Sequence, residues 1–157
     1  MKRWCIGWAI CCWGLASVVG QTPAFKATPD EINVFDLTNQ ERKKEKTPEL
    51  KLNPALSKIA RAHSENMARQ GKMAHTLDDK TPFDRLRAAG YIYLKAGENV
   101  AAGDEKASLP ILMKAWMDSE GHRKNILEPG FTEIGVGIAH DKNGQVYYTQ
   151  LFARPRK

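Results

Sequence analysis

The chain has 157 residues and a formal net charge of +6, from 24 lysines and arginines against 18 aspartates and glutamates. These charges are interspersed and form no basic stripe with interleaved aromatic side chains, which argues against nucleic-acid binding. All 3 cysteines (Cys5, Cys11 and Cys12) lie near the N-terminus, so the rest of the chain has no disulfide and must fold by burial alone. Its length is sufficient for one hydrophobic core.

The N-terminus has the pattern of an export signal. The basic Met1-Lys2-Arg3 precedes an apolar or weakly polar run over residues 4–20. We expect export to the outside or to the periplasm and cell envelope, with a signal peptide, a lead-in and one domain over residues 1–20, 21–29 and 30–154. The alternative is that the apolar run stays as an N-terminal membrane anchor.

Capping signals predict the first helix. Thr28-Pro29-Asp30-Glu31 is a capping box with proline at the first helical position. We expect Ile32, Phe35 and Leu37 on its apolar face and its end within the charged stretch 42–46.

A second helix is predicted from Asn53-Pro54, where asparagine caps and proline occupies the first turn. Its apolar positions follow the spacing of one buried stripe: Leu56, Ile59, Ala60, His63 and Met67. Gly71 is a favourable residue for its C-terminal cap.

Two further helices are predicted before the end of the chain. Thr81-Pro82 begins a short one that Gly90 closes, and a longer one covers residues 105–119. We expect Trp116, on the apolar face of the longer helix, to lie in the core.

The remaining segments favour strands. The β-prone stretches are 91–94, 133–139 and 146–152, and the last two flank a strong hairpin turn at Asp141-Lys142-Asn143-Gly144. The order of the predicted elements, with helices followed by an antiparallel hairpin, indicates an α+β domain in which helices pack on a small antiparallel sheet.

Histidines suggest where chemistry lies. We expect His140 on the surface and His63 in the core, hydrogen-bonded to a neighbour. His75 and His122 each follow the expected end of a helix, and Glu98 follows Gly97 in a third expected junction. Junctions are where functional side chains concentrate, and a His–Glu–His set is compatible with a metal site, an acid–base pair or no activity.

Two asparagines and one serine have structural interpretations. We expect Asn99 and Asn125 to hydrogen-bond backbone groups beside Gly97 and His122. Ser119 is three residues before His122, but a serine at a helix end more often caps or bonds the backbone. The chain also has no Gly-x-Ser-x-Gly or His-Glu-x-x-His motif.

Seven ordered segments resemble the CAP superfamily, which groups cysteine-rich secretory proteins, antigen 5 and plant pathogenesis-related 1 proteins, and in particular its bacterial, cysteine-poor branch. The segments are Asn39–Arg42, Leu52–Leu56, Ala62–Ser64, Met73–His75, Pro82–Arg85, Ala96–Asn99 and Trp116–Leu127, which leads into Phe131–Gly137. The resemblance spans residues 30–152.

The resemblance implies an α–β–α sandwich with a central cleft of two histidines and two acidic residues. It places His75, Glu98 and His122 at three of these positions. Many members carry glutamate at the fourth position, which is Ser119 here. Glu120 is one residue further, about 100° around a helix.

The resemblance also implies chemistry for the cleft. Two imidazoles suit zinc or another divalent metal, so we expect weak, exchangeable binding by His75 and His122, with Glu98 orienting a histidine. We favour a monomeric binding module for a small ligand, a lipid or an envelope component. A non-catalytic extracellular scaffold and a hydrolase, peptidase or esterase, stay open as alternatives.

Overall fold

The computed structural model describes residues 25–156, and the predicted signal peptide and residues 21–24 of the lead-in lie outside that range. The described elements are α1 (Pro29–Lys44), β1 (Lys51–Leu52), α2 (Pro54–Gln70), α3 (Pro82–Ala88), β2 (Tyr93–Asp104), α4 (Leu109–Asp118), α5 (Glu120–Leu127), β3 (Glu133–His140) and β4 (Gln145–Pro155). Within residues 25–156, no helix is long and apolar enough to cross a membrane.

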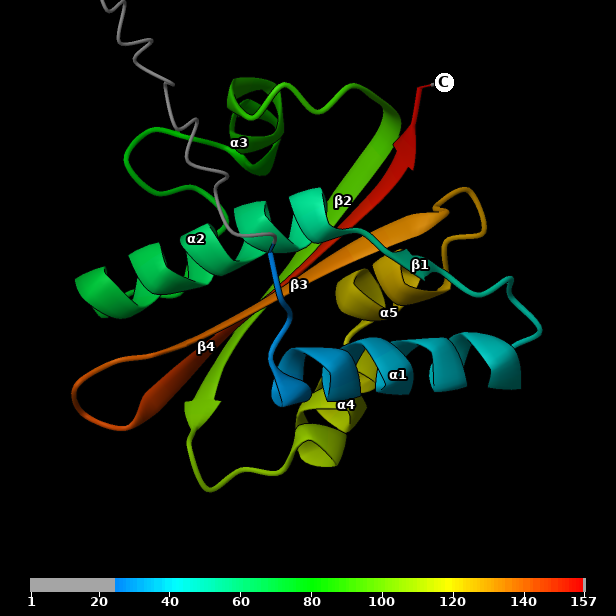
Figure 1. Ribbon diagram of the computed structural model, residues 1–157. Coiled ribbons are helices and arrows are strands. Elements are labelled where there is room, and N and C mark those ends of the chain that lie inside the picture. Colours follow the sequence, from blue (N-terminus) through cyan, green and yellow to red (C-terminus); the bar gives the residue numbers. More distant parts are fainter. Residues whose placement is uncertain (1–24, 157) are drawn as a thin grey trace, which may run out of the picture.

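The sheet has the strand order β1-β3-β4-β2 (Figure 1). β3 and β4 form the predicted hairpin, and β4 also pairs antiparallel with β2. The short β1 runs parallel to β3, so the sheet is mixed rather than purely antiparallel. The α+β class is confirmed, while two paired residues were too few to predict as a strand.

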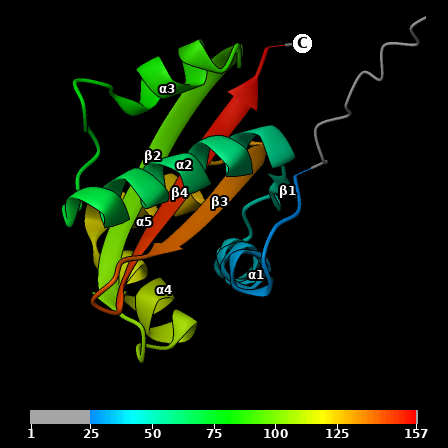
Figure 2. The same ribbon diagram turned by 60° about the vertical axis from the view of Figure 1, so that its left-hand side comes forward.

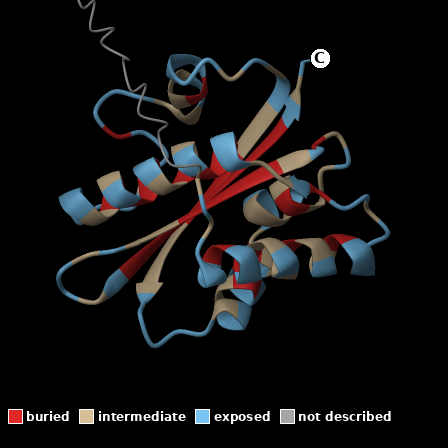
Figure 3. Ribbon diagram, viewed as in Figure 1, coloured by how far each residue is buried: buried red, intermediate tan, exposed pale blue. Residues whose placement is uncertain are grey.

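Helices cover both faces of the sheet (Figure 2). Leu151 and Ala153 of β4 pack with Leu56 and Ala60 of α2. The alternate residues, such as Phe152, join a core with α1, α4 and α5, which includes Val34, Met113, Trp116 and Ile126. Figure 3 shows the buried residues along the sheet between these layers. The result is the expected α–β–α sandwich, with Trp116 only 1% exposed.

Helix α2 lies directly on the backbone of β3. A Cβ at Gly137 would lie 2.1 Å from the backbone nitrogen of Arg61, and one at Gly135 would lie 2.2 Å from the carbonyl carbon of Leu56. The hydroxyl of Ser64 adds a hydrogen bond of 2.9 Å to the carbonyl of Gly137. Glycine is therefore required in β3 by the close approach of two backbones.

The capping box of α1 is present, but its deeply buried residues are polar except for Val34. Glu31, Thr38 and Arg42 are fully buried. On the predicted apolar face, by contrast, Ile32 is 36% exposed, and Phe35 and Leu37 are only partly buried. These polar groups are each paired. Glu31, for example, forms an ion pair with Arg61 of α2. Paired polar side chains are tolerated inside a protein, and an apolar-periodicity argument does not detect them.

Arg42 ties α1 to the end of α5. Its guanidinium donates to the carbonyl oxygens of Pro48 and Ile126 at 2.7 Å each, and to that of Glu128 at 3.0 Å. Burial lowers the pKa of Arg42. The N–H donors of its positively charged guanidinium suit the unpaired carbonyl oxygens at the C-terminal end of a helix. This contact fixes the position of α5, the helix that carries His122.

Three boundaries differ from the sequence-based expectations. Only residues 93–94 of the expected strand 91–94 lie in a strand, and that strand, β2, continues to Asp104, so Gly97, Glu98 and Asn99 lie inside it and form no junction. The expected helix 105–119 is the shorter α4, because residues 105–108 form a turn before it. His122 lies within α5, a separate helix of 8 residues, rather than past a helix end.

Substitution of Gly137 tests the α2–β3 contact. We expect Gly137→Ala to lower the free energy of unfolding by at least about 3 kcal/mol, because backbone atoms of α2 cannot make room for a methyl group. Gly103→Ala in β2 is the matched control, since its Cβ would meet nothing within 4 Å. Urea denaturation of both variants measures the difference, and equal stabilities would show that α2 does not rest on β3 in this way.

Candidate functional site

A buried carboxylate lies at the centre of the candidate site. The side chain of Glu98, in the middle of β2, is 2% exposed. One of its oxygens, Oε2, accepts a hydrogen bond of 2.6 Å from Nη2 of Arg85, and the other, Oε1, lies 2.9 Å from Nδ1 of His75. The structure therefore brings together two of the expected cleft residues, with an arginine that neutralises the carboxylate.

Arg85 was not singled out as a site residue from the sequence. It lies in α3, whose first turn is fixed by a capping box between Thr81 and Asp84. The second guanidinium nitrogen donates to the backbone carbonyls of His75 and Lys80 at 3.0 and 2.9 Å. Arg85 thus holds Glu98 and the segment that carries His75 at the same time. The sequence signal that could have identified Arg85 was its position in the Pro82–Arg85 segment, one of the segments that carry the family resemblance.

The contact with Glu98 fixes the tautomer of His75. A carboxylate paired with arginine accepts hydrogen bonds, so Nδ1 of His75 carries the proton and donates. The other ring nitrogen, Nε2, then holds a free lone pair. The His75 side chain is 52% exposed, so this lone pair is accessible to a ligand.

His63 lies behind the same carboxylate. It is 1% exposed, its Nε2 donates to the carbonyl of Ala74 at 2.9 Å, and the same nitrogen is 4.0 Å from Oε1 of Glu98. Burial lowers the pKa of His63, although the nearby Glu98 opposes the shift. His63 is therefore a neutral, hydrogen-bonded core histidine that supports the site from α2.

His122 lies on α5 and is half-buried. Its pKa is lowered first by burial and then by the charge of His75. The carbonyl of His122 accepts a hydrogen bond of 3.1 Å from the side chain of Asn99 in β2. His122 is thus neutral near pH 7 and positioned against β2, next to the residue after Glu98.

A buried amide network holds α5 on the sheet. Asn125 donates to the carbonyl of Glu98 at 3.1 Å and to the side chain of Asn99 at 2.9 Å. Asn99 in turn donates to Gln150 of β4 at 3.0 Å, and Gln150 donates to Thr38 of α1 at 2.7 Å. Asn99 and Asn125 do bond backbone groups, but between a strand and a helix rather than around a turn.

The fourth expected position has no clear acidic occupant. Ser119 joins α4 to α5 and makes no side-chain cap hydrogen bond, and it lines a small cavity together with His122. Glu120 is exposed in the first turn of α5, and within residues 25–156 it makes no hydrogen bond or ion pair through its carboxylate. No group of three or more histidine, cysteine, aspartate or glutamate side chains in this part of the chain is arranged to hold a metal ion.

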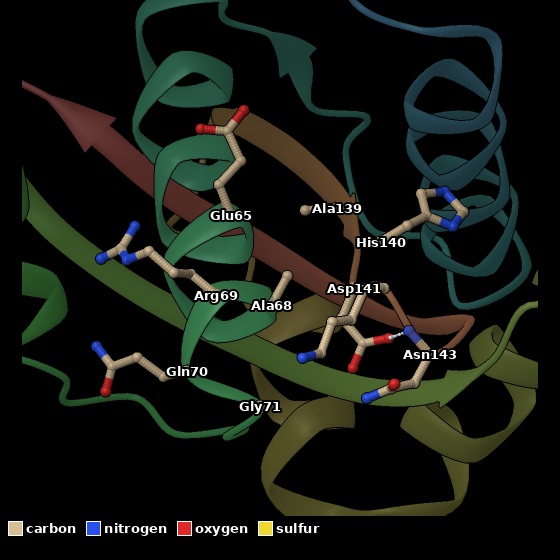
Figure 4. Close-up of a pocket in the computed structure, with 10 residues that line it drawn as sticks. Glu65, Ala68, Arg69, Gln70, Gly71, Ala139, His140, Asp141 and Asn143 are labelled. Carbon is tan, nitrogen blue, oxygen red and sulfur yellow. Dashed lines mark hydrogen bonds between the residues drawn. The ribbon is translucent and has the colours of Figure 1, made fainter.

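A larger hollow of about 570 Å³ lies away from this site (Figure 4). It is bounded by the C-terminal end of α2 and the β3–β4 hairpin, with Glu65, Arg69 and His140 on its walls. Asp141 uses its carboxylate to accept the backbone N–H of Asn143, which stabilises the hairpin turn. These are exposed polar groups with no link to Glu98, so the candidate site stays at His75, Glu98 and His122.

The comparisons with known proteins agree with the fold. The model of the CAP family, described as the cysteine-rich secretory protein family, matches residues 35–152. YkwD of Bacillus subtilis (strain 168), an uncharacterized protein, is 41% identical over 125 residues, which are 79% of this chain and 47% of YkwD. YlbC of the same strain, an uncharacterized membrane protein, is 32% identical over 128 residues, which are 81% of this chain and 35% of YlbC. The chain spans less than half the length of both relatives.

Among solved structures, an extracellular protein containing an SCP domain from Bacillus anthracis str. Ames has the same fold. The TM-score is 0.71 and the sequence identity 32%, over 82% of this chain and 44% of that one.

Removal of Glu98 tests its pairing with Arg85. We expect Glu98→Gln to lower the free energy of unfolding by about 3 kcal/mol, because it leaves a mostly buried guanidinium without its counter-charge. The double variant Glu98→Gln, Arg85→Met should lose much less than the sum of the two single losses. Urea denaturation of the four proteins gives the coupling energy, and strictly additive losses would contradict the pairing. Glu120→Gln is the exposed control, expected to stay within about 0.5 kcal/mol of wild type.

The buried His63 and the half-buried His122 predict how stability depends on pH. Burial lowers the pKa of both His63 and His122 from 6.5, so just below that pH the unfolded chain binds more protons than the folded chain. The free energy of unfolding should therefore fall as the pH decreases through 6.5 toward the lowered pKa values. His122→Asn should make this loss smaller in urea titrations at a series of pH values. An unchanged slope would mean that His122 is not buried as described.

Proposed function

Because the chain belongs to the cysteine-rich secretory protein (CAP) family, we propose that it is an exported binding module with a metal-responsive cleft. His75 and His122 hold a divalent metal such as zinc, and Glu98 orients His75. The metal in turn helps to engage a small ligand, a lipid or an envelope component. The extracellular SCP-domain protein of Bacillus anthracis supports a place outside the cytoplasm.

The observation that carries this proposal is the contact between Glu98 and His75. The contact uses Nδ1 of a side chain that is 52% exposed and leaves Nε2 for a metal, and a carboxylate behind a histidine is the usual partner of a metal-binding imidazole. His122 contributes a second imidazole, which its lowered pKa keeps neutral. Neutral imidazole nitrogens are the donor set that zinc prefers, so these residues fit the metal.

The same geometry limits how tightly a metal binds. Arg85 and His75 occupy one oxygen each of Glu98, so its carboxylate serves as an outer partner rather than a ligand. Two protein ligands leave the other positions of a tetrahedral ion to water or to a bound molecule. Such a site is weak and exchangeable, which suits a binding module more than a permanent structural metal.

Calorimetric titration with zinc tests the proposal. Wild-type protein, purified without a histidine tag, should show weak but saturable binding. His75→Ala and His122→Ala should each abolish it, because one imidazole alone does not retain the ion. His140→Ala is a matched control, since the His140 side chain is 50% exposed and that of His75 is 52% exposed.

Absence of binding up to about 1 mM zinc, in a folded wild-type protein, would contradict the metal-binding cleft. Binding that survives in His75→Ala would place the metal elsewhere. The scaffold and hydrolase alternatives separate in the same samples. A hydrolase requires turnover of peptide or ester substrates above the rate of His122→Ala, whereas a scaffold shows neither turnover nor zinc binding.

A further inference from the structure

An apolar cavity of about 340 Å³ opens beside His122, between the edge of β2 and helix α4. Residues 100–103 of β2 form one wall. Ile111, Leu112 and Trp116 of α4 form the other, and His122 and Ser119 lie at one end. The cavity therefore adjoins the proposed cleft and shares His122 with it, while its other walls come from different residues.

The β2 wall offers unpaired backbone groups. In antiparallel strands, alternate residues direct N–H and C=O toward one neighbour, and those between direct them away. Val136 of β3 bonds a serine hydroxyl of α2 through its N–H, so it faces away from β4. Its partner Gln150 then faces β2, and the partner of Gln150, Asn99, faces β4. It follows that Val100 and Ala102 point their N–H and C=O groups outward.

Ala102 lies partly exposed at the edge of the sheet, whereas Val100 is only 4% exposed. β2 is the last strand of the sheet, and α5 covers it around Glu98 and Asn99, where Asn125 donates to the carbonyl of Glu98 and to the side chain of Asn99. Within residues 25–156, no hydrogen bond reaches the backbone of Val100 or Ala102 from outside the β2–β4 ladder. An unpaired strand edge is a template for a further strand.

The cavity also has exposed apolar side chains and lies beside a buried hydrogen-bond donor that has no acceptor. Met73 and Ile111, at its rim, are 51% and 62% exposed and are two of the large apolar side chains that the fold leaves in water. Trp116 is 1% exposed, yet its indole N–H has no hydrogen-bond partner in the described structure. A buried donor without an acceptor is destabilising, and Trp116 is one of the residues that line the cavity.

We propose that this cavity binds an extended peptide, which pairs as a short strand with the outward N–H and C=O groups of Ala102 at the edge of β2 and inserts one apolar side chain beside Trp116. The ligand class follows from the hydrogen-bonding groups. A peptide backbone presents alternating donors and acceptors that match those of β2, whereas an acyl chain leaves them unpaired. The inference rests on the proposed function, because it assigns a ligand class to the cavity that shares His122 with the proposed metal-binding cleft.

Fluorescence anisotropy with synthetic peptides tests the proposal. The probes are a panel of labelled pentapeptides, blocked at both ends, with one central apolar side chain flanked by threonines. Each has a matched version in which the backbone nitrogens next to the centre are methylated. We expect at least one parent peptide to bind the full-length protein, and its methylated version to bind at least about tenfold more weakly.

Variants of β2 locate the binding edge. Ala102→Pro removes an outward N–H but no bond of the ladder to β4, and should weaken binding of the parent peptide about tenfold. Ala96→Pro is the matched control, because its N–H also faces outward but lies outside the cavity. Circular dichroism checks that both variants fold. If either variant does not fold, the comparison of parent and methylated peptides on the wild-type protein still tests the backbone pairing.

Three results would overturn the proposal: no peptide binding up to about 1 mM, equal binding of parent and methylated peptides, or binding of dodecanoic acid in place of the peptides. Repeating the titrations with a chelator and in His75→Ala separates the two proposals. Peptide binding that persists while zinc binding is lost supports the strand edge and leaves the metal as a separate question. Zinc binding without any peptide binding supports the metal cleft and rejects the peptide.

Discussion

The arrangement of the cleft depends on the buried carboxylate of Glu98. An ionised carboxylate inside a protein is strongly destabilising unless cations and hydrogen bonds compensate it. The compensation comes from separate parts of the chain: Arg85 on α3 at 2.6 Å and His75 in the preceding loop at 2.9 Å. Each of these contacts also fixes a piece of backbone, so neutralising one charge shapes the α2–α3 side of the cleft.

The other side of the cleft depends on how α5 is attached to the sheet. Asn125 and Asn99 join α5 to β2, and Gln150 extends the network to α1 on the same face. Arg42 holds the C-terminal end of α5 through its carbonyl groups. Side-chain networks of this kind specify one arrangement because a shift of the helix leaves buried polar atoms unpaired. The position of His122 is therefore as well determined as that of His75.

Local signals in the sequence were sufficient for the helix starts and the hairpin. Thr28, Asn53 and Thr81 cap their helices as expected, because capping involves only residues a few positions apart. Contacts between distant residues were not predictable in this way. The buried polar residues of α1, the two residues of β1 and the pairing of Glu98 with Arg85 all depend on partners that a periodic pattern does not identify. The family resemblance named His75, Glu98 and His122 as candidate cleft residues, but it did not predict that Glu98 lies within a strand.

The most direct test of the central claim is the protonation state of the His75 ring, measured by long-range ¹H–¹⁵N NMR of the histidine side chains. The account predicts that His75 carries its proton on Nδ1, held by Glu98, and that added zinc perturbs Nε2 of His75 together with the ring of His122. A His75 ring protonated on Nε2, or a zinc-induced change confined to other histidines, would contradict it.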